Sequence, residues 1–247
     1  VGHLVLPSIL GLAVFKPGQV LETNSFVLGA LVESCGGAVT RHPMVADDTS
    51  RIKAAVEAAL GDGYQAVMIL GGSSAGSEDF ARAVIAELGE VFVHGVTIMP
   101  GKPAVVGHVG GVPAFGMPGY PVSAIIVFEQ LVRPLLAELL GQPETARTTV
   151  TVEPTRKIAS KLGLEEFVRV KLGEVSGRIV ATPLPRGAGQ ITSITEADGI
   201  IRIPADTEGI KENERVAADL LRPVSEPAVE PPLLMTAWYP APIAAST

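Results

Sequence analysis

Three glycine-containing turns, each placed directly after a short apolar run, constrain the fold of this chain more than any other feature. The first turn is Gly71-Gly72-Ser73-Ser74-Ala75-Gly76, and the others are Pro100-Gly101-Lys102-Pro103 and Pro118-Gly119-Tyr120-Pro121. Glycine lets a backbone pass close to a ligand, and flanking prolines hold a turn in one shape. Turns of this kind at strand ends indicate an α/β protein with a site for a phosphorylated ligand.

Strand and helix signals alternate from about residue 16 to residue 141. Apolar residues at helical spacing predict helices over 24–35, 47–61, 78–88 and 122–140. Short apolar runs predict strands over 64–70, 104–109 and 112–117. Gly110-Gly111 is a hairpin signal, and Pro134 is expected to kink or divide the last helix. The alternation predicts an α/β domain over residues 1–142, with a largely parallel sheet sandwiched by helices.

The pattern changes after Gly141. Five short, β-rich segments bounded by turns then follow, at 148–152, 166–172, 178–181, 199–203 and 215–220. No amphipathic helix of normal length separates them, so they predict a small all-β barrel over residues 146–222. Residues 223–247 are rich in proline and are expected to form a tail or linker.

Composition excludes several classes of function. The formal net charge is -7, the 19 Lys and Arg residues are scattered, and aromatic residues make up only 4% of the chain. These values argue against a nucleic-acid surface. Cys35 is the only cysteine, which excludes disulfides within the chain and thiolate zinc sites. No apolar run is long enough to span a membrane and no signal peptide is apparent, so we expect a cytoplasmic protein with a small-molecule ligand.

Two acidic positions follow predicted strands and precede predicted helices. Asp47 stands beside Asp48 before one helix, and Asp79 lies in the first turn of the next. Each has a purely local interpretation, because an aspartate at such a place caps a helix or interacts with its dipole. In a doubly wound sheet the two sites could also converge at one edge, where carboxylates beside a phosphate favour Mg²⁺. Both interpretations stay open.

The glycine loop and Lys102 are equally open to two interpretations. The loop at 71–76 is either a tight strand-to-helix turn or an anion site at a helix N-terminus, with Ser73 and Ser74 adding hydroxyls. Lys102 is either a solvated surface lysine or a point charge for an oxyanion. The 4 histidines show no metal-ligand spacing, and no nucleophile elbow, Walker loop or dinucleotide fingerprint occurs. The residues alone predict an enzyme acting on a phosphorylated ligand.

Three ordered segments carry a resemblance to a known family. They are 71–79, the segment His94-Gly95-Val96-Thr97-Ile98-Met99-Pro100-Gly101-Lys102-Pro103, and 116–124. Together they resemble the molybdopterin-binding domain of molybdopterin adenylyltransferases (MogA type) and molybdopterin molybdenumtransferases (MoeA type, including the C-terminal half of gephyrin). The resemblance covers residues 16–141. Segments 16–25 and 186–193 are similar to the molybdenumtransferase branch.

That branch implies an enzyme of molybdenum cofactor biosynthesis. The reaction it implies is the insertion of molybdate into adenylylated molybdopterin, with Mg²⁺-dependent release of AMP. Mg²⁺ is then the expected cofactor, and molybdate and molybdopterin are the substrates. The resemblance also implies a homodimer in the full-length protein, with other molybdenum cofactor biosynthesis proteins as further partners.

The resemblance assigns roles to individual residues. Asp47 and Asp79 match acidic residues of the metal and catalytic region, and Lys102 is the third expected catalytic residue. The expected substrate-binding residues are Gly71, Gly72, Ser73, Ser74, Gly76, Pro100, Gly101, Pro103, Pro118, Gly119, Ser123 and Ser193. Arg169 is a further candidate from the barrel.

Three departures from the family pattern keep alternatives open. Residues 6–11 do not match the family's Pro-Thr-Gly-Asp-Glu loop, Met99 stands where many members have lysine, and Tyr120 replaces the commoner asparagine. One alternative is a molybdopterin adenylyltransferase, against which the attached barrel argues. The other is a non-catalytic module that binds molybdopterin or a protein partner.

Overall fold

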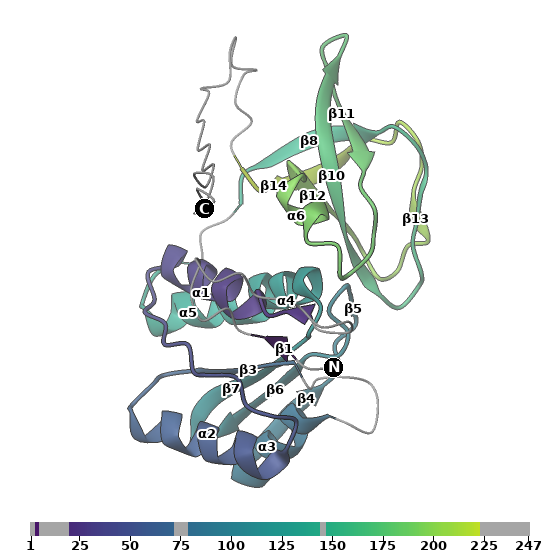
Figure 1. Cartoon of the computed structure of the whole chain (residues 1–247). Coiled ribbons are helices and arrows are strands. Elements are labelled where there is room, and N and C mark those ends of the chain that lie inside the picture. The colour runs from purple at the N-terminus through teal and green to yellow at the C-terminus, as the bar shows by residue number, and fades with distance from the viewer. Residues whose placement is uncertain (1–2, 5–19, 72–78, 144–146, 223–247) are drawn as a thin grey trace, which may run out of the picture.

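The computed structural model describes residues 3–4, 20–71, 79–143 and 147–222 (Figure 1). An α/β part comes first and a small β-barrel follows it, so the predicted fold class is confirmed. The proline-rich segment at 223–247 lies outside the described residues. Within the ranges given above, the structure contains no helix with the length and apolar character needed to cross a membrane.

The α/β part is built on a four-stranded sheet with the order β3-β7-β6-β4. Its strands are β3 (Val67–Leu70), β4 (Gly89–His94), β6 (Val105–Val109) and β7 (Val112–Met117). Strands β3 and β7 are parallel, whereas β7 with β6 and β6 with β4 are antiparallel. The expectation of a largely parallel sheet is therefore corrected for the described strands. The sheet is mixed because the hairpin at Gly110-Gly111 reverses the chain between β6 and β7.

Helices cover both faces of this sheet, as predicted (Figure 1). One face carries α2 (Thr49–Gly61) and α3 (Phe80–Leu88), and the other carries α1 (Asn24–Ser34), α4 (Pro121–Val127), η1 (Phe128–Val132) and α5 (Arg133–Leu139). Each face has its own buried apolar cluster, which includes Phe115 and Phe128 beneath α1 and Ile85 and Val105 beneath α3. A separate parallel pair joins β1 (His3–Leu4) to β2 (Val20–Leu21).

The long apolar helix after Pro121 is divided near Pro134. Between α4 and α5 the chain widens into the π-helix η1, where the Arg133 N–H bonds to the Phe128 carbonyl five residues back. Proline has no N–H and cannot continue an α-helical ladder, which accounts for a local change of pitch just before it. The division predicted at Pro134 is confirmed.

Two expectations around α2 and α3 need correction. Residues 37–48 contain neither helix nor strand, so the strand expected before Asp47 is absent from this described segment. Asp48 caps α2, because its carboxylate accepts a hydrogen bond from the Arg51 N–H at 2.9 Å. A strand that the sequence did not predict, β4, follows α3 directly and forms one edge of the sheet.

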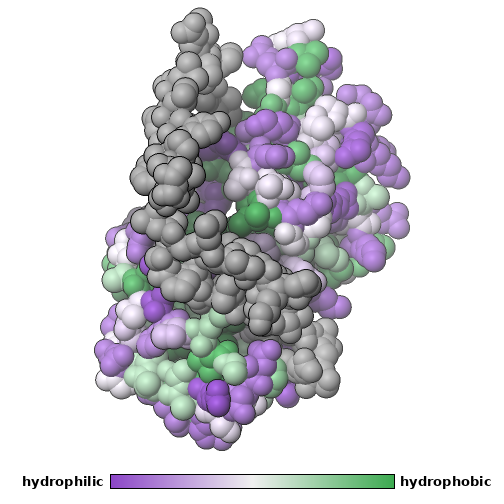
Figure 2. All heavy atoms as spheres, viewed as in Figure 1, coloured by the Kyte–Doolittle hydropathy of each residue, from purple (hydrophilic) through white to green (hydrophobic). Residues whose placement is uncertain are grey.

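The second part is a closed barrel of five strands in the order β10-β11-β8-β14-β12-β10. They are β8 (Thr149–Pro154), β10 (Glu165–Val175), β11 (Arg178–Pro183), β12 (Gly199–Ile203) and β14 (Val216–Leu220). Every one matches a predicted strand. Short elements add α6 (Thr192–Thr195) and the pair β9 (Ile158–Ala159) with β13 (Gly209–Ile210). Polar residues prevail on the barrel surface seen in Figure 2.

The barrel is docked on the α/β part through backbone and apolar contacts. Strand β5 (Ile98–Met99) pairs in parallel with β10, and the Glu165 N–H donates to the Thr97 carbonyl at 2.8 Å. A buried cluster joins Val122 and Ile126 of α4 to Phe167 and Ile200 of the barrel. These contacts fix the turn before β6 against the start of β10. The domain limits at 142 and 146 stay predictions.

Candidate functional site

One edge of the four-stranded sheet gathers the predicted glycine turns. Strands β3, β4 and β7 run in the same direction, as their pairings require, so their carboxyl ends lie at the same edge. Gly71 follows β3, Gly95 follows β4 and Pro118 follows β7. The turn at 100–103 precedes β6, whose amino end is at that edge because β6 is antiparallel to its neighbours. The described residues of the three turns therefore lie at one edge of the sheet.

The first and third turns touch each other. The Gly71 N–H donates to the Met117 carbonyl at 3.1 Å, and a Cβ on Gly119 would stand 3.9 Å from the Gly71 Cα. Gly71 has a φ of +81°, a conformation that glycine adopts readily. Gly72, Ser73, Ser74 and Gly76 lie outside the described residues. The described part of the site is thus a close contact between two backbones, with little side chain between them.

A buried asparagine holds the third turn from outside the motif. The Asn24 Nδ2 donates to the Gly119 carbonyl at 2.9 Å, and the Asn24 side chain belongs to the buried residues. Asn24 is the first residue of α1, 95 positions away in the sequence. The helical spacing over 24–35 predicts only that Asn24 lies at a helix start, so its role in fixing the turn was not predicted.

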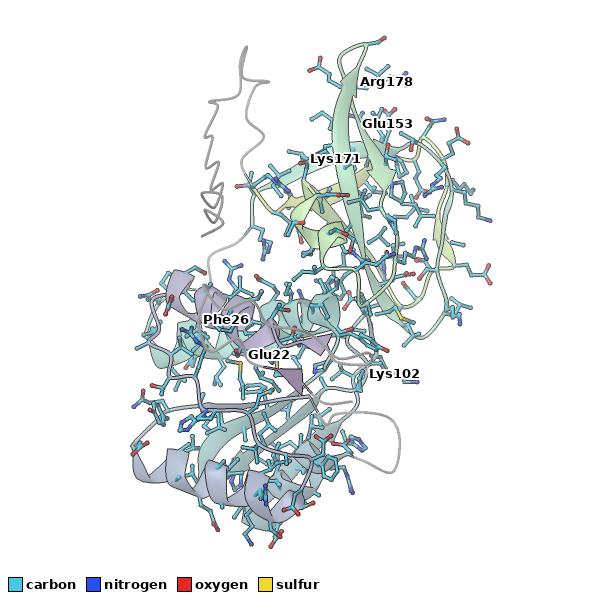
Figure 3. The ribbon with its side chains drawn as sticks, in the orientation of Figure 1. Glu22, Phe26, Lys102, Glu153, Lys171 and Arg178 are labelled. Carbon is cyan, nitrogen blue, oxygen red and sulfur yellow. The ribbon has the colours of Figure 1, made fainter. Side chains whose placement is uncertain are left out.

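The second turn is shaped by packing at Gly101. This glycine is buried with a φ of +134°, and a Cβ there would come within 2.9 Å of side-chain carbons of Ile98 and Val127. The Val96 N–H donates to the Lys102 carbonyl at 2.9 Å, which closes the turn. Lys102 itself is exposed, and Figure 3 shows it directed outward beside the border between the two parts of the chain. The fold therefore fixes the Lys102 backbone and leaves its ammonium group accessible.

Asp79 is held at the same edge by two partners. One carboxylate oxygen accepts from the Arg82 N–H at 3.0 Å and caps α3, and the other lies 2.8 Å from the His94 Nε2. The Asp79 side chain is only 9% exposed, whereas that of His94 is 45% exposed. This contact orients the His94 imidazole at the carboxyl end of β4. Asp79 therefore caps α3 and also lies at the candidate site.

Asp47 is exposed and does not cap a helix. In the described segments, no group of three or more His, Cys, Asp or Glu side chains lies together in a way that could hold a metal ion. Asp47 and Asp79 fit Mg²⁺ in ligand type but not in number, because this ion takes six oxygen ligands. A Mg²⁺ ion at this edge would need further oxygens from substrate and water.

A cavity of about 400 Å³ lies where the second turn meets the barrel. Its lining residues are Met99, Pro100, Ala159, Ser160, Lys161, Leu164, Glu166, Arg169 and Arg186. Three of these side chains are cationic and one is a carboxylate, so the cavity favours an anion. Within the described residues the Ser160 hydroxyl oxygen is buried and lacks a hydrogen-bond partner. It adds a polar group that a bound ligand could satisfy.

Arg169 forms the floor of this cavity. It is 2% exposed, and its guanidinium donates to the Ser193 hydroxyl at 3.3 Å and to the Pro185 carbonyl at 2.7 Å. Burial lowers the pKa of Arg169 from its ordinary value, and the group stays charged because that ordinary value lies far above neutrality. Arg186 pairs with Glu166 at 2.9 Å beside it. The fold thus brings together Arg169 and Ser193, both candidates from the sequence, and adds Arg186.

Ser123 and the remaining turn residues are placed by α4. Ser123 is 5% exposed in the first turn of that helix, and Pro118 is buried just before it. The Val122 N–H donates to the Ala188 carbonyl of the barrel at 3.1 Å. Pro103 is half-buried at the end of the second turn. The described glycine turns therefore lie at the sheet edge, and the barrel's Arg169, with Ser193 as its partner, lines the cavity next to it.

Comparison with known families decides what this arrangement belongs to. Residues 4–138 match the family described as "Probable molybdopterin binding domain". The chain belongs to this molybdopterin-binding domain family. Residues 151–221 match a second family, described as the MoeA C-terminal region (domain IV). The resemblance drawn from the three motifs and from segment 186–193 is therefore confirmed.

Relatives and solved structures agree with this membership. A molybdopterin biosynthesis protein of Methanocaldococcus jannaschii is 36% identical over 205 residues, covering 83% of this chain and 48% of the relative. Molybdopterin molybdenumtransferase 1 of Mycobacterium tuberculosis is 32% identical, covering 81% of this chain and 48% of the relative. The crystal structure of a MoeA protein from Pyrococcus horikoshii superposes with a TM-score of 0.72 at 35% identity, covering 88% of this chain and 52% of that one. The chain spans about half the length of the curated relatives it matches.

Proposed function

We propose that this chain carries the catalytic part of a molybdopterin molybdenumtransferase, which inserts molybdate into adenylylated molybdopterin with Mg²⁺-dependent release of AMP. The observation that carries the proposal is the cationic cavity around Arg169, which lies beside the turn 100–103 of the molybdopterin-binding domain. The relatives described above are named as a molybdopterin biosynthesis protein and a molybdopterin molybdenumtransferase, which supports the proposal. The cavity supplies what such a transfer needs next to a phosphate site, namely a place for a second anion.

The phosphate of the pterin substrate is assigned to the contact between Gly71 and Gly119. Glycine at both positions places no side chain in the way of a ligand, since even a Cβ built on Gly119 would stand 3.9 Å from the Gly71 Cα. Asn24 and the barrel loop at Ala188 hold this turn from two sides. Anions are bound best by donors that are fixed before binding, since less ordering is then needed.

Molybdate is assigned to the cavity. A tetrahedral dianion requires positive charge and hydrogen-bond donors, which Arg169, Arg186 and Lys161 provide there. Met99 lines the same cavity and stands where many family members have lysine, so this chain has one cation fewer at that point. Lys102 lies three residues further along the same turn and reaches the border from the α/β side. We assign to Lys102 the role of a mobile positive charge for the transferring group.

Mg²⁺ would be held by Asp47 and Asp79, with substrate oxygens completing its coordination. When bound, it neutralises charge on the phosphoanhydride that links molybdopterin to AMP. His94 keeps the Asp79 carboxylate in place through the 2.8 Å contact with its Nε2. A homodimer of the full-length enzyme, a cytoplasmic location and contacts with other molybdenum cofactor proteins stay predictions.

The proposal is tested by AMP release from adenylylated molybdopterin with Mg²⁺, with and without molybdate. Arg186→Gln is expected to lower molybdate-dependent release about tenfold at subsaturating molybdate, since hydrogen bonds to charged groups contribute about 1.5–3 kcal/mol. Arg178→Gln is the matched control, because Arg178 also pairs with a glutamate, Glu153 at 3.1 Å, but at the far end of the barrel (Figure 3). The control is expected to match the parent chain. Absence of molybdate-dependent release in the parent chain would contradict the transferase and favour the non-catalytic binding module.

A further inference from the structure

Tyr120 occupies a position where a different residue would stabilise the fold. It is the N-cap of α4, with the extended backbone typical of that position, and its side chain makes no capping hydrogen bond. Asparagine, aspartate and serine are preferred at an N-cap because their side chains accept a hydrogen bond from the first turn of the helix. A tyrosine therefore gives up a stabilising interaction here. Residues that reduce stability in this way are typical of functional sites.

The Tyr120 ring is also unusually open. It is 67% exposed, which exceeds every other large apolar or aromatic side chain in the described part of the molecule. Its chain neighbour Gly119 is the residue that approaches Gly71. An aromatic ring is thus presented to solvent directly beside the turns to which a phosphate is assigned.

The barrel contacts this ring with a glycine. A Cβ built on Gly189 would stand 3.4 Å from the Tyr120 Cδ1 and 3.7 Å from its Cε1. Gly189 does not have a positive φ, so its backbone conformation does not require glycine. Any larger side chain at 189 would pack on the ring and cover part of it. Glycine at this point leaves the ring accessible.

We propose that Tyr120 binds the substrate by stacking on a planar heteroaromatic ring whose phosphate lies at the turns of Gly71 and Gly119. This inference rests on the proposed function, which places such a phosphate there. The adenylylated substrate offers two rings of this chemistry, the pterin and the adenine. Aromatic side chains stack on heteroaromatic rings of either kind through dispersion and burial of apolar area. Tyr120 is then a substrate-contacting residue that the family's usual asparagine could not replace.

Two substitutions separate stacking from a structural role. Tyr120→Asn is expected to raise the melting temperature, by about 2–4 °C if the new cap forms. The same substitution is expected to weaken binding about tenfold, within the range measured for loss of an aromatic stacking partner. Tyr120→Phe keeps the ring and is expected to bind as the parent chain does. A merely structural residue would not raise stability and lower affinity together.

A third variant changes the barrel residue that contacts the Tyr120 ring. Gly189→Val is compatible with the backbone and places methyl groups against Tyr120, so it is expected to lower affinity with little change in stability. Affinities are measured by calorimetry with two probes, neopterin monophosphate and AMP. Loss of affinity for the pterin probe alone assigns the ring to the pterin, and loss for AMP alone assigns it to the adenine.

The outcomes distinguish this inference from the proposed function. If the parent chain binds a probe and Tyr120→Asn binds both probes equally well, the stacking role is wrong and the phosphate site stands. If the parent chain binds neither probe, the phosphate site and the stacking role fall together. Reduced affinity in both Tyr120→Asn and Gly189→Val, with Tyr120→Phe unchanged, supports the inference.

Discussion

Removal of the Asn24 side chain tests whether the third glycine turn is positioned from α1. The Asn24 Nδ2 donates to the Gly119 carbonyl at 2.9 Å, and Asn24 is 8% exposed. A hydrogen bond of this kind contributes about 0.5–1.5 kcal/mol net, and a buried group left without a partner costs about 1–3 kcal/mol. Gly119 itself is exposed, so water can replace part of the lost interaction. We therefore expect Asn24→Ala to lower the free energy of unfolding by about 1–2 kcal/mol.

Asn24→Ala is expected to change the affinity for a phosphorylated ligand more than it changes the stability of the fold. Once the Gly119 carbonyl is released, the turn 118–119 gains freedom and must be ordered again when a phosphate binds. Asn24→Asp keeps the size of the side chain but places an acceptor against the carbonyl, so its effect is expected to be at least as large as that of Asn24→Ala. Both variants are then expected to bind neopterin monophosphate more weakly than the parent chain.

Urea unfolding gives the stability change, and calorimetry with neopterin monophosphate gives the change in affinity. Ser34→Ala is the control on the same helix, because the Ser34 hydroxyl donates to the Leu31 carbonyl at 2.8 Å on an exposed surface. It is expected to change stability by less than about 0.5 kcal/mol. Equal stability and equal affinity for Asn24→Ala and Ser34→Ala would refute the assignment of Asn24 as the residue that positions the turn.

Three further predictions follow from the same geometry. Asp79→Asn retains an oxygen that can cap α3 but loses the carboxylate charge. Metal-dependent AMP release is therefore expected to disappear, while the affinity for the pterin probe changes only a few-fold. Unchanged AMP release would exclude a metal role for Asp79. At Gly101 a φ of +134° is combined with Cβ contacts of 2.9 Å, so Gly101→Ala is expected to lower the free energy of unfolding in urea by about 2–5 kcal/mol. Gly63 has a φ of +81° and open space around it, so Gly63→Ala is expected to lower it by only about 1 kcal/mol. Equal losses would show that the packing around Gly101 relaxes freely. Burial alone would raise the pKa of Asp198, but the Leu172 N–H and the Lys171 ammonium outweigh it and hold that pKa below its ordinary value. The stability from Asp198 is therefore present above the unfolded-state pKa of about 3.9 and is lost as pH falls through the lower folded value. Urea unfolding at neutral pH and below pH 4 is expected to show a smaller acid-induced loss in Asp198→Asn than in the parent chain, and identical losses would contradict this.

The sequence predicted the barrel more fully than the α/β sheet. All five barrel strands were visible because each is short, β-rich and bounded by turn residues, and the hairpin was visible because Gly110-Gly111 permits positive φ at both positions. Strand β4 was missed for two reasons. It follows α3 without an intervening turn, and as an edge strand it is mostly exposed, so it lacks the alternation of apolar and polar residues that marks a half-buried strand.

For the candidate site, the order of strands along the chain predicted which turns lie together, but not the side-chain contacts that hold them. Turns that follow parallel strands must meet at one edge, and this was enough to bring Gly71 near Gly119. The bond from Asn24 to Gly119 depends on how α1 packs, and no local pattern reports it. The contact between Arg169 and Ser193 likewise depends on tertiary structure, because α6 carries Ser193 and must pack beside β10 in the closed barrel.

Docking of the barrel is what joins the two halves of the proposed reaction. The phosphate turns belong to the α/β part, whereas the buried guanidinium and its hydroxyl partner belong to the barrel. The pairing of β5 with β10, including the bond from the Glu165 N–H to the Thr97 carbonyl, and the bond from the Val122 N–H to the Ala188 carbonyl fix one part against the other through the backbone. The second of these bonds starts in the first turn of α4 and ends next to Gly189, whose place against the Tyr120 ring sets how open that ring is. A small shift of the barrel would therefore change the phosphate turn, the exposed ring and the anion cavity together. Pterin and molybdate should accordingly bind cooperatively in this chain, because each would stabilise the same docked arrangement.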